Sequence, residues 1–162
     1  MASSEKRSKR ILIVDDEENI REILTEYLDE FGYDVTSAIN GKDALQIYNK
    51  ERFDIILSDL VMKPMDGMEL LGEIKKLDQD AIFIMITGYP SVDSAMEAIK
   101  KGARDYITKP FNIDEIKIKI ERALLERSMK GSLKNIQGIV WALVISIPAW
   151  LLLGIILARS LK

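Results

Sequence analysis

Three acidic side chains follow predicted strands at points where a ligand could bind. Asp15 and Asp16 come directly after the apolar run 11–14, and Asp59 ends the strand that begins at Ile55. In an open parallel sheet, ligands bind beyond the carboxyl ends of the strands, where the strand order reverses. Three carboxylates that converge there cannot all stay ionised without a cation. The sequence therefore predicts a site for a divalent cation such as Mg²⁺, bound by oxygen atoms and water.

Two further polar residues end predicted strands. Thr87 ends the fourth strand and Lys109 the fifth, which adds a hydroxyl and an ammonium group to the carboxylates. Singly, each residue has an ordinary explanation, because acidic pairs often cap helices and a lysine is usually a solvated surface charge. Together, each at a strand end, they favour a functional site.

The composition excludes several kinds of chemistry. The chain has 162 residues with no Cys and no His, so it has no disulfide, thiolate nucleophile, zinc finger or Ser-His-Asp triad. Any metal must then be a hard ion with oxygen ligands. Residues 1–135 carry 21 Lys and Arg against 26 Asp and Glu. This acidic balance argues against nucleic acid as a partner, since such binding depends on basic patches that face phosphates.

Short apolar runs alternate with amphipathic periods, which predicts βα units on a parallel sheet. We expect five strands, over residues 11–14, 33–37, 55–57, 81–86 and 105–108. We expect five helices, over residues 20–31, 42–51, 68–77, 92–99 and 112–127. Ser91 is a predicted N-cap, Gly102 a predicted helix stop, and Asn112 with Glu115 a predicted capping box. The predicted fold class is α/β, a doubly wound five-stranded sheet with the order 2-1-3-4-5.

Polar and apolar segments divide the chain into five predicted parts: a disordered N-terminus over 1–8, a domain over 9–128, a linker over 129–135, a transmembrane helix over 136–158 and a tail over 159–162. Residues 139–158 hold no charge and 12 Ile, Leu or Val. A helix of that length spans ~30 Å, the thickness of the hydrocarbon core of a bilayer. The alternative is a core helix, but a complete α/β sandwich has no place for a helix that is apolar on every face.

Small residues recur along one stripe of the predicted span, at Gly138, Ala142, Ser146, Gly154 and Ala158. Such spacing allows close helix contact, although membrane helices are rich in small residues in general. Formation of a homodimer through this stripe is therefore held as a hypothesis.

Three segments resemble the receiver domain of bacterial two-component response regulators, and most of all receivers of the nitrogen-regulation type. They are ILIVDDEENIREIL, SDLVMKPMDGMELL and MITGYPSVDSAMEAIKKGARDYITKPF. The resemblance covers about residues 9–128 and implies a flavodoxin-like fold. It also implies Mg²⁺ as cofactor and a sensor histidine kinase or phosphotransfer protein as partner. The chain would then be a phospho-acceptor switch and not an enzyme, since it catalyses only its own phosphorylation and dephosphorylation.

The resemblance implies a role for each site residue. Asp59 corresponds to the phospho-accepting aspartate, and Asp15 and Asp16 to the Mg²⁺ ligands, with the carbonyl of Val61 as a further ligand. Thr87 corresponds to the switch hydroxyl and Lys109 to the ammonium group that pairs with the phosphoryl group. Tyr106 corresponds to the aromatic switch that turns inward as Thr87 moves, and Lys109-Pro110 to a cis peptide bond. The face formed by the fourth helix, the fifth strand and the fifth helix would report the change.

The sequence departs from the family pattern beside the predicted acceptor. Pro64 stands one place later than usual, so Lys63 takes the position of that proline. Val61 and Tyr89, each two residues after a site residue, are bulky. We interpret them as a shield that keeps water from the acyl phosphate.

The resemblance and the apolar segment together predict the location of the protein. Arg122, Arg127, Lys130 and Lys134 precede the predicted span, and by the positive-inside rule they place the domain in the cytoplasm. We expect a single-pass protein on the cytoplasmic face of the bacterial inner membrane. A different function is a docking module on the same fold that is not phosphorylated. A hydrolase is less favoured, because no second nucleophile is visible.

Overall fold

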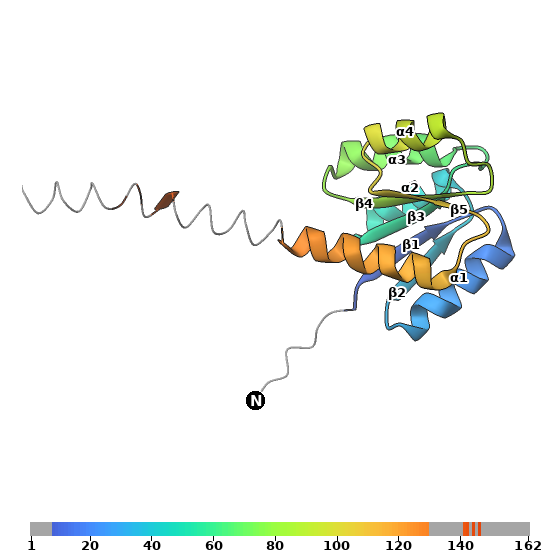
Figure 1. The fold of residues 1–162 in the computed structure, drawn as a ribbon, viewed down its shortest axis with the longest axis horizontal. Helices are drawn as coiled ribbons and strands as arrows, with labels where there is room; N and C mark the ends of the chain where they lie inside the picture. The colour runs from blue at the N-terminus through green and yellow to red at the C-terminus, as the bar shows by residue number, and fades with distance from the viewer. Residues whose placement is uncertain (1–7, 130–140, 143, 145, 147–162) are drawn as a thin grey trace, which may run out of the picture. The chain divides into compact units, whose positions relative to one another are not determined.

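The computed structural model describes residues 8–129, 141, 142, 144 and 146 (Figure 1). The chain divides into two compact units, Met1–Ala123 and Leu124–Lys162. Every residue of the predicted acidic site belongs to the first unit.

Five parallel strands form one sheet in the order β2-β1-β3-β4-β5, which confirms the predicted topology. They are β1 (Arg10–Val14), β2 (Asp34–Ala38), β3 (Ile55–Asp59), β4 (Ile82–Thr87) and β5 (Asp105–Thr108). The order reverses at β1 and β3, where Val14 pairs with Ser58. The residues that follow this pair, Asp15 and Asp59, therefore lie next to each other at the carboxyl edge of the sheet.

Four labelled helices and the part of one further helix that belongs to the first unit cover the sheet. They are α1 (Glu18–Glu30), α2 (Gly41–Lys50), α3 (Gly67–Leu77), α4 (Val92–Lys100) and the helical residues 113–129. In Figure 1, α2, α3 and α4 lie on one face of the sheet, and α1 lies on the other face with the helix that begins at residue 113. Two layers of helices thus enclose the sheet, as in doubly wound folds.

Two of the three predicted helix signals are confirmed. The Ser91 side chain accepts from the Ser94 amide at the start of α4, and Gly102, at φ +100°, follows the end of α4. The predicted capping box at Asn112 is wrong in detail, because Asn112 Oδ1 accepts from the Asp114 amide at 2.9 Å and not from Glu115. The short side chain of Asn bonds the amide two residues on, as in an Asx turn.

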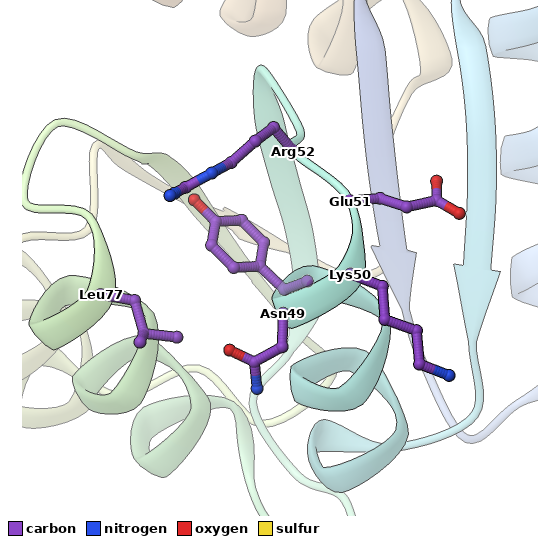
Figure 2. Close-up of a pocket in the computed structure, with 6 residues that line it drawn as sticks. Asn49, Lys50, Glu51, Arg52 and Leu77 are labelled. Atoms are coloured by element: carbon purple, nitrogen blue, oxygen red, sulfur yellow. The ribbon is translucent and has the colours of Figure 1, made fainter.

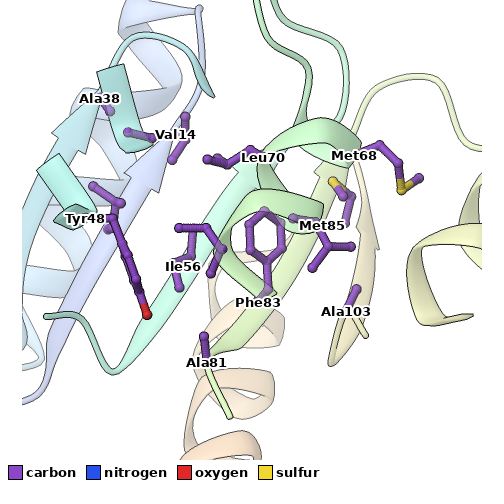
Figure 3. Close-up of a cluster of buried hydrophobic side chains, with 14 of the residues drawn as sticks. Val14, Ala38, Tyr48, Ile56, Met68, Leu70, Ala81, Phe83, Met85 and Ala103 are labelled. Carbon is purple, nitrogen blue, oxygen red and sulfur yellow. The ribbon is translucent and has the colours of Figure 1, made fainter. Parts of the chain in front are cut away.

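The core explains why the central strands read as continuous apolar runs. Every residue of β3 and β4 is buried, because helices cover both faces of these strands. In Figure 3, Tyr48 and Leu70 lie over the sheet residues Ile56 and Phe83. This packing holds the strand ends, and therefore the site residues that follow them, in fixed positions.

Within the residues that the structure describes, no helix is long and apolar enough to cross a membrane. The predicted span over 136–158 lies outside the described residues, except for positions 141, 142, 144 and 146. The predicted N-terminus over 1–8, the linker over 129–135 and the tail over 159–162 also lie largely or wholly outside them.

Candidate functional site

Three carboxylates meet at the carboxyl edge of the sheet, as the sequence predicts. Asp15, Asp16 and Asp59 each offer an oxygen, and these oxygens lie within 4.8 Å of one another. Asp15 and Asp59 are buried, whereas Asp16 is exposed. The cluster therefore opens to solvent on the side of Asp16.

Backbone contacts fix Asp15 at the end of β1. Its amide donates to Ala38 O, and its Oδ1 accepts from the Glu17 amide at 2.9 Å. Arg21, one turn into α1, donates to the Asp15 carbonyl at 2.8 Å. These contacts hold the Asp15 carboxylate between strand and helix with its second oxygen turned to the site.

Lys109 is the cation that the structure places in this cluster. Its Nζ lies 2.8 Å from Asp15 Oδ2, 3.1 Å from Glu17 Oε1 and 3.8 Å from Asp59 Oδ1. Burial disfavours the charge of Lys109, but the hydrogen bonds with Asp15 and Glu17 outweigh this effect and raise its pKa. Lys109 therefore stays charged and partly neutralises the carboxylates.

Asp59 is the least satisfied member of the cluster. Its Oδ1 is buried and, among the described residues, has no hydrogen-bond partner. Burial raises the pKa of Asp59 to about 6; Lys109 opposes this effect, while Asp15 adds to it. A buried carboxylate oxygen that accepts no hydrogen bond, with Lys109 only at 3.8 Å, favours a proton or a further cation.

These residues fit Mg²⁺. The donor set consists of carboxylate oxygens, which magnesium prefers, and one of them stays open to water at Asp16. Asp15, Asp16 and Asp59 would hold the ion, and Val61 follows Asp59 closely enough in sequence for its carbonyl to join them. The chain has no His or Cys that would favour a softer metal.

Thr87 ends β4, and Tyr106 is the second residue of the neighbouring strand β5. Thr87 is fully buried, and its Oγ1 accepts from the Tyr89 amide at 3.1 Å. Tyr106 is half-buried, with its Oη 2.9 Å from Ser94 Oγ on α4. Among the described residues, these contacts join Thr87 and Tyr106 to Tyr89 and Ser94 and not to the carboxylates, so their predicted switch roles stay predictions.

The loops beside the site carry the departures seen in the sequence. The Lys109-Pro110 peptide bond is cis, as the resemblance implies, and so is the Lys63-Pro64 bond. The side chains of Val61 and Tyr89 are 51% and 77% exposed. Both therefore lie at the surface, where a shield against water would have to be.

Sequence reasoning missed two residues of the site. Glu17 binds Lys109, and its membership of the acidic run 15–18 was the available signal. Gly67 begins α3 directly against the carbonyl of Asp59, so that a Cβ there would overlap this carbonyl. No local pattern reveals such a close approach, because it depends on packing between α3 and β3.

A separate pocket of about 110 Å³ lies at the end of α2, away from the carboxyl edge (Figure 2). It is lined by Tyr48, Asn49, Lys50, Glu51, Arg52 and Leu77. Tyr48 Oη donates to Asp78 Oδ2 at 3.4 Å, and Arg52 lies 3.9 Å from the same oxygen. These polar contacts link the end of α2 to the end of α3, and we assign them a structural role.

Comparison with known proteins identifies relatives of the first unit. The family model of the response regulator receiver domain matches residues 11–121. Sporulation initiation phosphotransferase F of Bacillus subtilis is 39% identical over 117 residues, which cover 72% of this chain and 94% of that protein. Regulatory protein AtoC of Escherichia coli is 38% identical over 127 residues, 78% of this chain. The match spans only 28% of AtoC, so most of that protein has no counterpart here.

Solved structures show the same fold. A response regulator receiver domain protein (CheY-like) from Methanospirillum hungatei has a TM-score of 0.74 at 35% identity, covering 76% of this chain and 98% of that one. Response regulator protein TrrA of Thermotoga maritima, solved in complex with Mg²⁺-BeF, has a TM-score of 0.66 at 41% identity. That match covers 71% of this chain and 98% of TrrA.

Proposed function

Because this chain belongs to the response regulator receiver domain family, we propose that it accepts a phosphoryl group on Asp59 in a Mg²⁺-dependent reaction. The donor is a sensor histidine kinase or a phosphotransfer protein. The observation that carries the proposal is the meeting of Asp15, Asp16 and Asp59 within 4.8 Å, with Lys109 beside them.

In the proposed reaction, Asp59 is the nucleophile. One of its carboxylate oxygens forms a bond to phosphorus while the bond between phosphorus and the donor histidine nitrogen breaks, and the electron pair stays on that nitrogen. Asp59 Oδ1 is suited to this role because, among the described residues, it accepts no hydrogen bond that would have to be broken first.

Positive charges beside Asp59 would compensate the negative charge of the incoming phosphoryl group. Mg²⁺, when bound, neutralises negative charge on the phosphoryl oxygens. Lys109 supplies a second positive charge 3.8 Å from Asp59. Asp15 and Glu17 hold that ammonium group in place.

The phosphorylated state would act through a change of surface. A phosphoryl group adds about 1.5–2 negative charges and new acceptor oxygens. We expect Thr87 and Lys109 to turn toward it, and α4, β5 and the helix that follows to present a different face to a partner. In this proposal the chain is a switch: it takes a phosphoryl group from the donor onto its own Asp59 and modifies no other molecule.

We further propose that the apolar segment over 136–158 tethers the receiver to the cytoplasmic face of the bacterial inner membrane. The composition of this segment supports the tether: 12 of its residues 139–158 are Ile, Leu or Val, and none is charged. At roughly −0.5 kcal/mol for each such residue, insertion would gain on the order of 6 kcal/mol.

One experiment tests both parts. Membranes from cells that express the full chain are separated from the soluble fraction, and each fraction is treated with acetyl phosphate and Mg²⁺ before intact-mass analysis. We expect the chain in the membrane fraction with the mass of one added phosphoryl group, and no addition for Asp59→Asn or with EDTA. An unmodified wild-type chain would favour the docking module instead, and a chain in the soluble fraction would contradict the tether.

A further inference from the structure

One hydroxyl outside the acidic cluster lies where several hydrogen-bonding groups meet. In the first turn of α4, Ser94 Oγ lies 2.8 Å from Ser91 Oγ, 3.0 Å from Ser91 O and 3.3 Å from Ser91 N. The fourth neighbour is Tyr106 Oη of β5, at 2.9 Å. A serine hydroxyl has one proton and two lone pairs. Ser94 Oγ accepts from the Ser91 amide and the Ser91 hydroxyl, its own proton lies within reach of the Ser91 carbonyl and of Tyr106 Oη, and in the pair with Tyr106 either hydroxyl can donate.

These bonds belong to a continuous path from the site to β5. At the site, buried Thr87 accepts from the Tyr89 amide at 3.1 Å. Two residues later Ser91 caps α4, and its side chain accepts from the Ser94 amide at 3.0 Å. Ser94 then contacts Tyr106, twelve residues further along the chain. Displacement of Thr87 would therefore also displace the start of α4, where Ser94 holds the Tyr106 hydroxyl.

We propose that Ser94 is a positioning residue that restrains the switch: its hydroxyl ties Tyr106 to α4 in the unphosphorylated chain, and this tie breaks on phosphorylation. The inference rests on the proposed function, since it assigns a regulator to the same site. Movement of Thr87 toward a phosphoryl group on Asp59 pulls the loop that leads to Ser91. The shared hydroxyl of Ser94 cannot follow this loop and keep Tyr106 in its present position.

A bond that exists in one state alone shifts the balance between the two states. Its removal favours the switched state, and by linkage the switched state's ligand then binds more tightly. Loss of one neutral hydrogen bond corresponds to a change of about 2- to 10-fold. We therefore expect Ser94→Ala to bind beryllofluoride, in the presence of Mg²⁺, about 2- to 10-fold more tightly than wild type.

The test is a beryllofluoride titration of the full chain in detergent micelles, followed by NMR signals of backbone amides. Tyr106→Phe should raise the affinity as Ser94→Ala does, and the double variant should bind no more tightly than either. Ser94→Thr keeps the hydroxyl and should restore wild-type affinity. Asn40→Ala is the control, because it also removes a capping side chain, which accepts from the Asp43 amide at the start of α2, outside the path from Thr87 to Tyr106, so its effect should multiply with that of Tyr106→Phe.

Two outcomes overturn the inference: an unchanged or weaker affinity in Ser94→Ala, or fold-changes of Ser94→Ala and Tyr106→Phe that multiply in the double variant. If wild type binds no beryllofluoride, the proposed function fails instead. The tie is then judged from urea unfolding of the same variants without the anion. Non-additive losses for Ser94→Ala and Tyr106→Phe would support the tie, and additive losses would overturn it.

Discussion

Asp59 carries a charge that the fold does not fully compensate, and this makes stability depend on pH. Burial raises its pKa from 3.8 to about 6. A raised pKa in the folded state means that the protonated form stabilises the fold at low pH and that this contribution is lost as pH rises through about 6. The contribution is lost mainly between about pH 3.8 and pH 6 and amounts to about 3 kcal/mol in total. Without metal, we therefore expect wild type to lose about 1.4 kcal/mol relative to Asp59→Asn between pH 5 and pH 8.

The measurement is urea unfolding of both proteins in EDTA at the two pH values. Addition of Mg²⁺ at pH 8 should stabilise wild type more than Asp59→Asn, because the ion compensates the ionised carboxylate. A stability difference between the two proteins that stays constant from pH 5 to pH 8 would show that Asp59 is not strained by its burial.

Val61 and Tyr89 set a second property, the lifetime of the phosphorylated state. Both side chains are more than half exposed beside the site. If they exclude water from the acyl phosphate, the Val61→Ser, Tyr89→Ser double variant should lose its phosphoryl group several-fold faster. The decay is followed by intact mass after removal of acetyl phosphate. Ile118→Ser, also at an exposed apolar position, is the control, and an equal lifetime in all three proteins would refute the shield.

The site residues could be predicted to the extent that they follow strands. Asp15, Asp59 and Thr87 were found because apolar runs end at them, and parallel strands bring those ends together. Glu17 and Ser94 were not assigned, because their partners Lys109 and Tyr106 lie far away in the sequence. Contacts of this kind depend on the direction in which each side chain points, and the spacing of residues in the sequence does not predict that direction.

The strands, too, could be predicted from apolar runs, whereas their boundaries depend on pairing with other strands. β3 and β4 were recognisable because they are buried on both faces, and each ends at the predicted polar residue, Asp59 or Thr87. β2 lies at the edge of the sheet, and the structure has it over Asp34–Ala38, one residue later than predicted. Its register on β1, with Arg10 opposite Asp34, decides this boundary, and the pairing is long-range.

α3 contains two glycines, and alanine substitutions at them distinguish the effect of close packing against β3 from the effect of helix propensity. At Gly67 a Cβ would overlap the Asp59 carbonyl, whereas at Gly72 it would meet nothing within 4 Å. Gly67→Ala must push α3 away from β3, and we expect a loss of about 2 kcal/mol or more. Gly72→Ala should instead stabilise the protein by about 0.5–1 kcal/mol, because alanine favours the helix.

Urea unfolding measures both changes, and labelling by acetyl phosphate reports their effect on the site. Gly67→Ala should label more slowly than wild type, because Asp59 is displaced, and Gly72→Ala should label normally. Equal stabilities of the two variants would mean that α3 and β3 do not fit as closely as the structure shows.

At the scale of the whole molecule, the site and the apolar segment belong to different units. All of the cluster residues lie in Met1–Ala123, and the apolar segment lies in Leu124–Lys162. Charge is also unevenly divided along the sequence, because residues 136–162 contain Arg159 and Lys162 and no other charged residue. Phosphoryl acceptance and membrane attachment should therefore be separable.

We expect a chain that ends at residue 135 to appear in the soluble fraction and to accept a phosphoryl group from acetyl phosphate at a rate within about 2-fold of the full chain, since each domain has its own core. In the full chain, Leu152→Arg adds a charge that costs about 3 kcal/mol at the centre of a span, and it should weaken membrane attachment where Leu152→Ala does not. Fractionation and intact mass measure both properties in the four proteins. Retention of the shortened chain by membranes would locate the attachment in the receiver itself, and loss of its labelling would show that the two units are coupled.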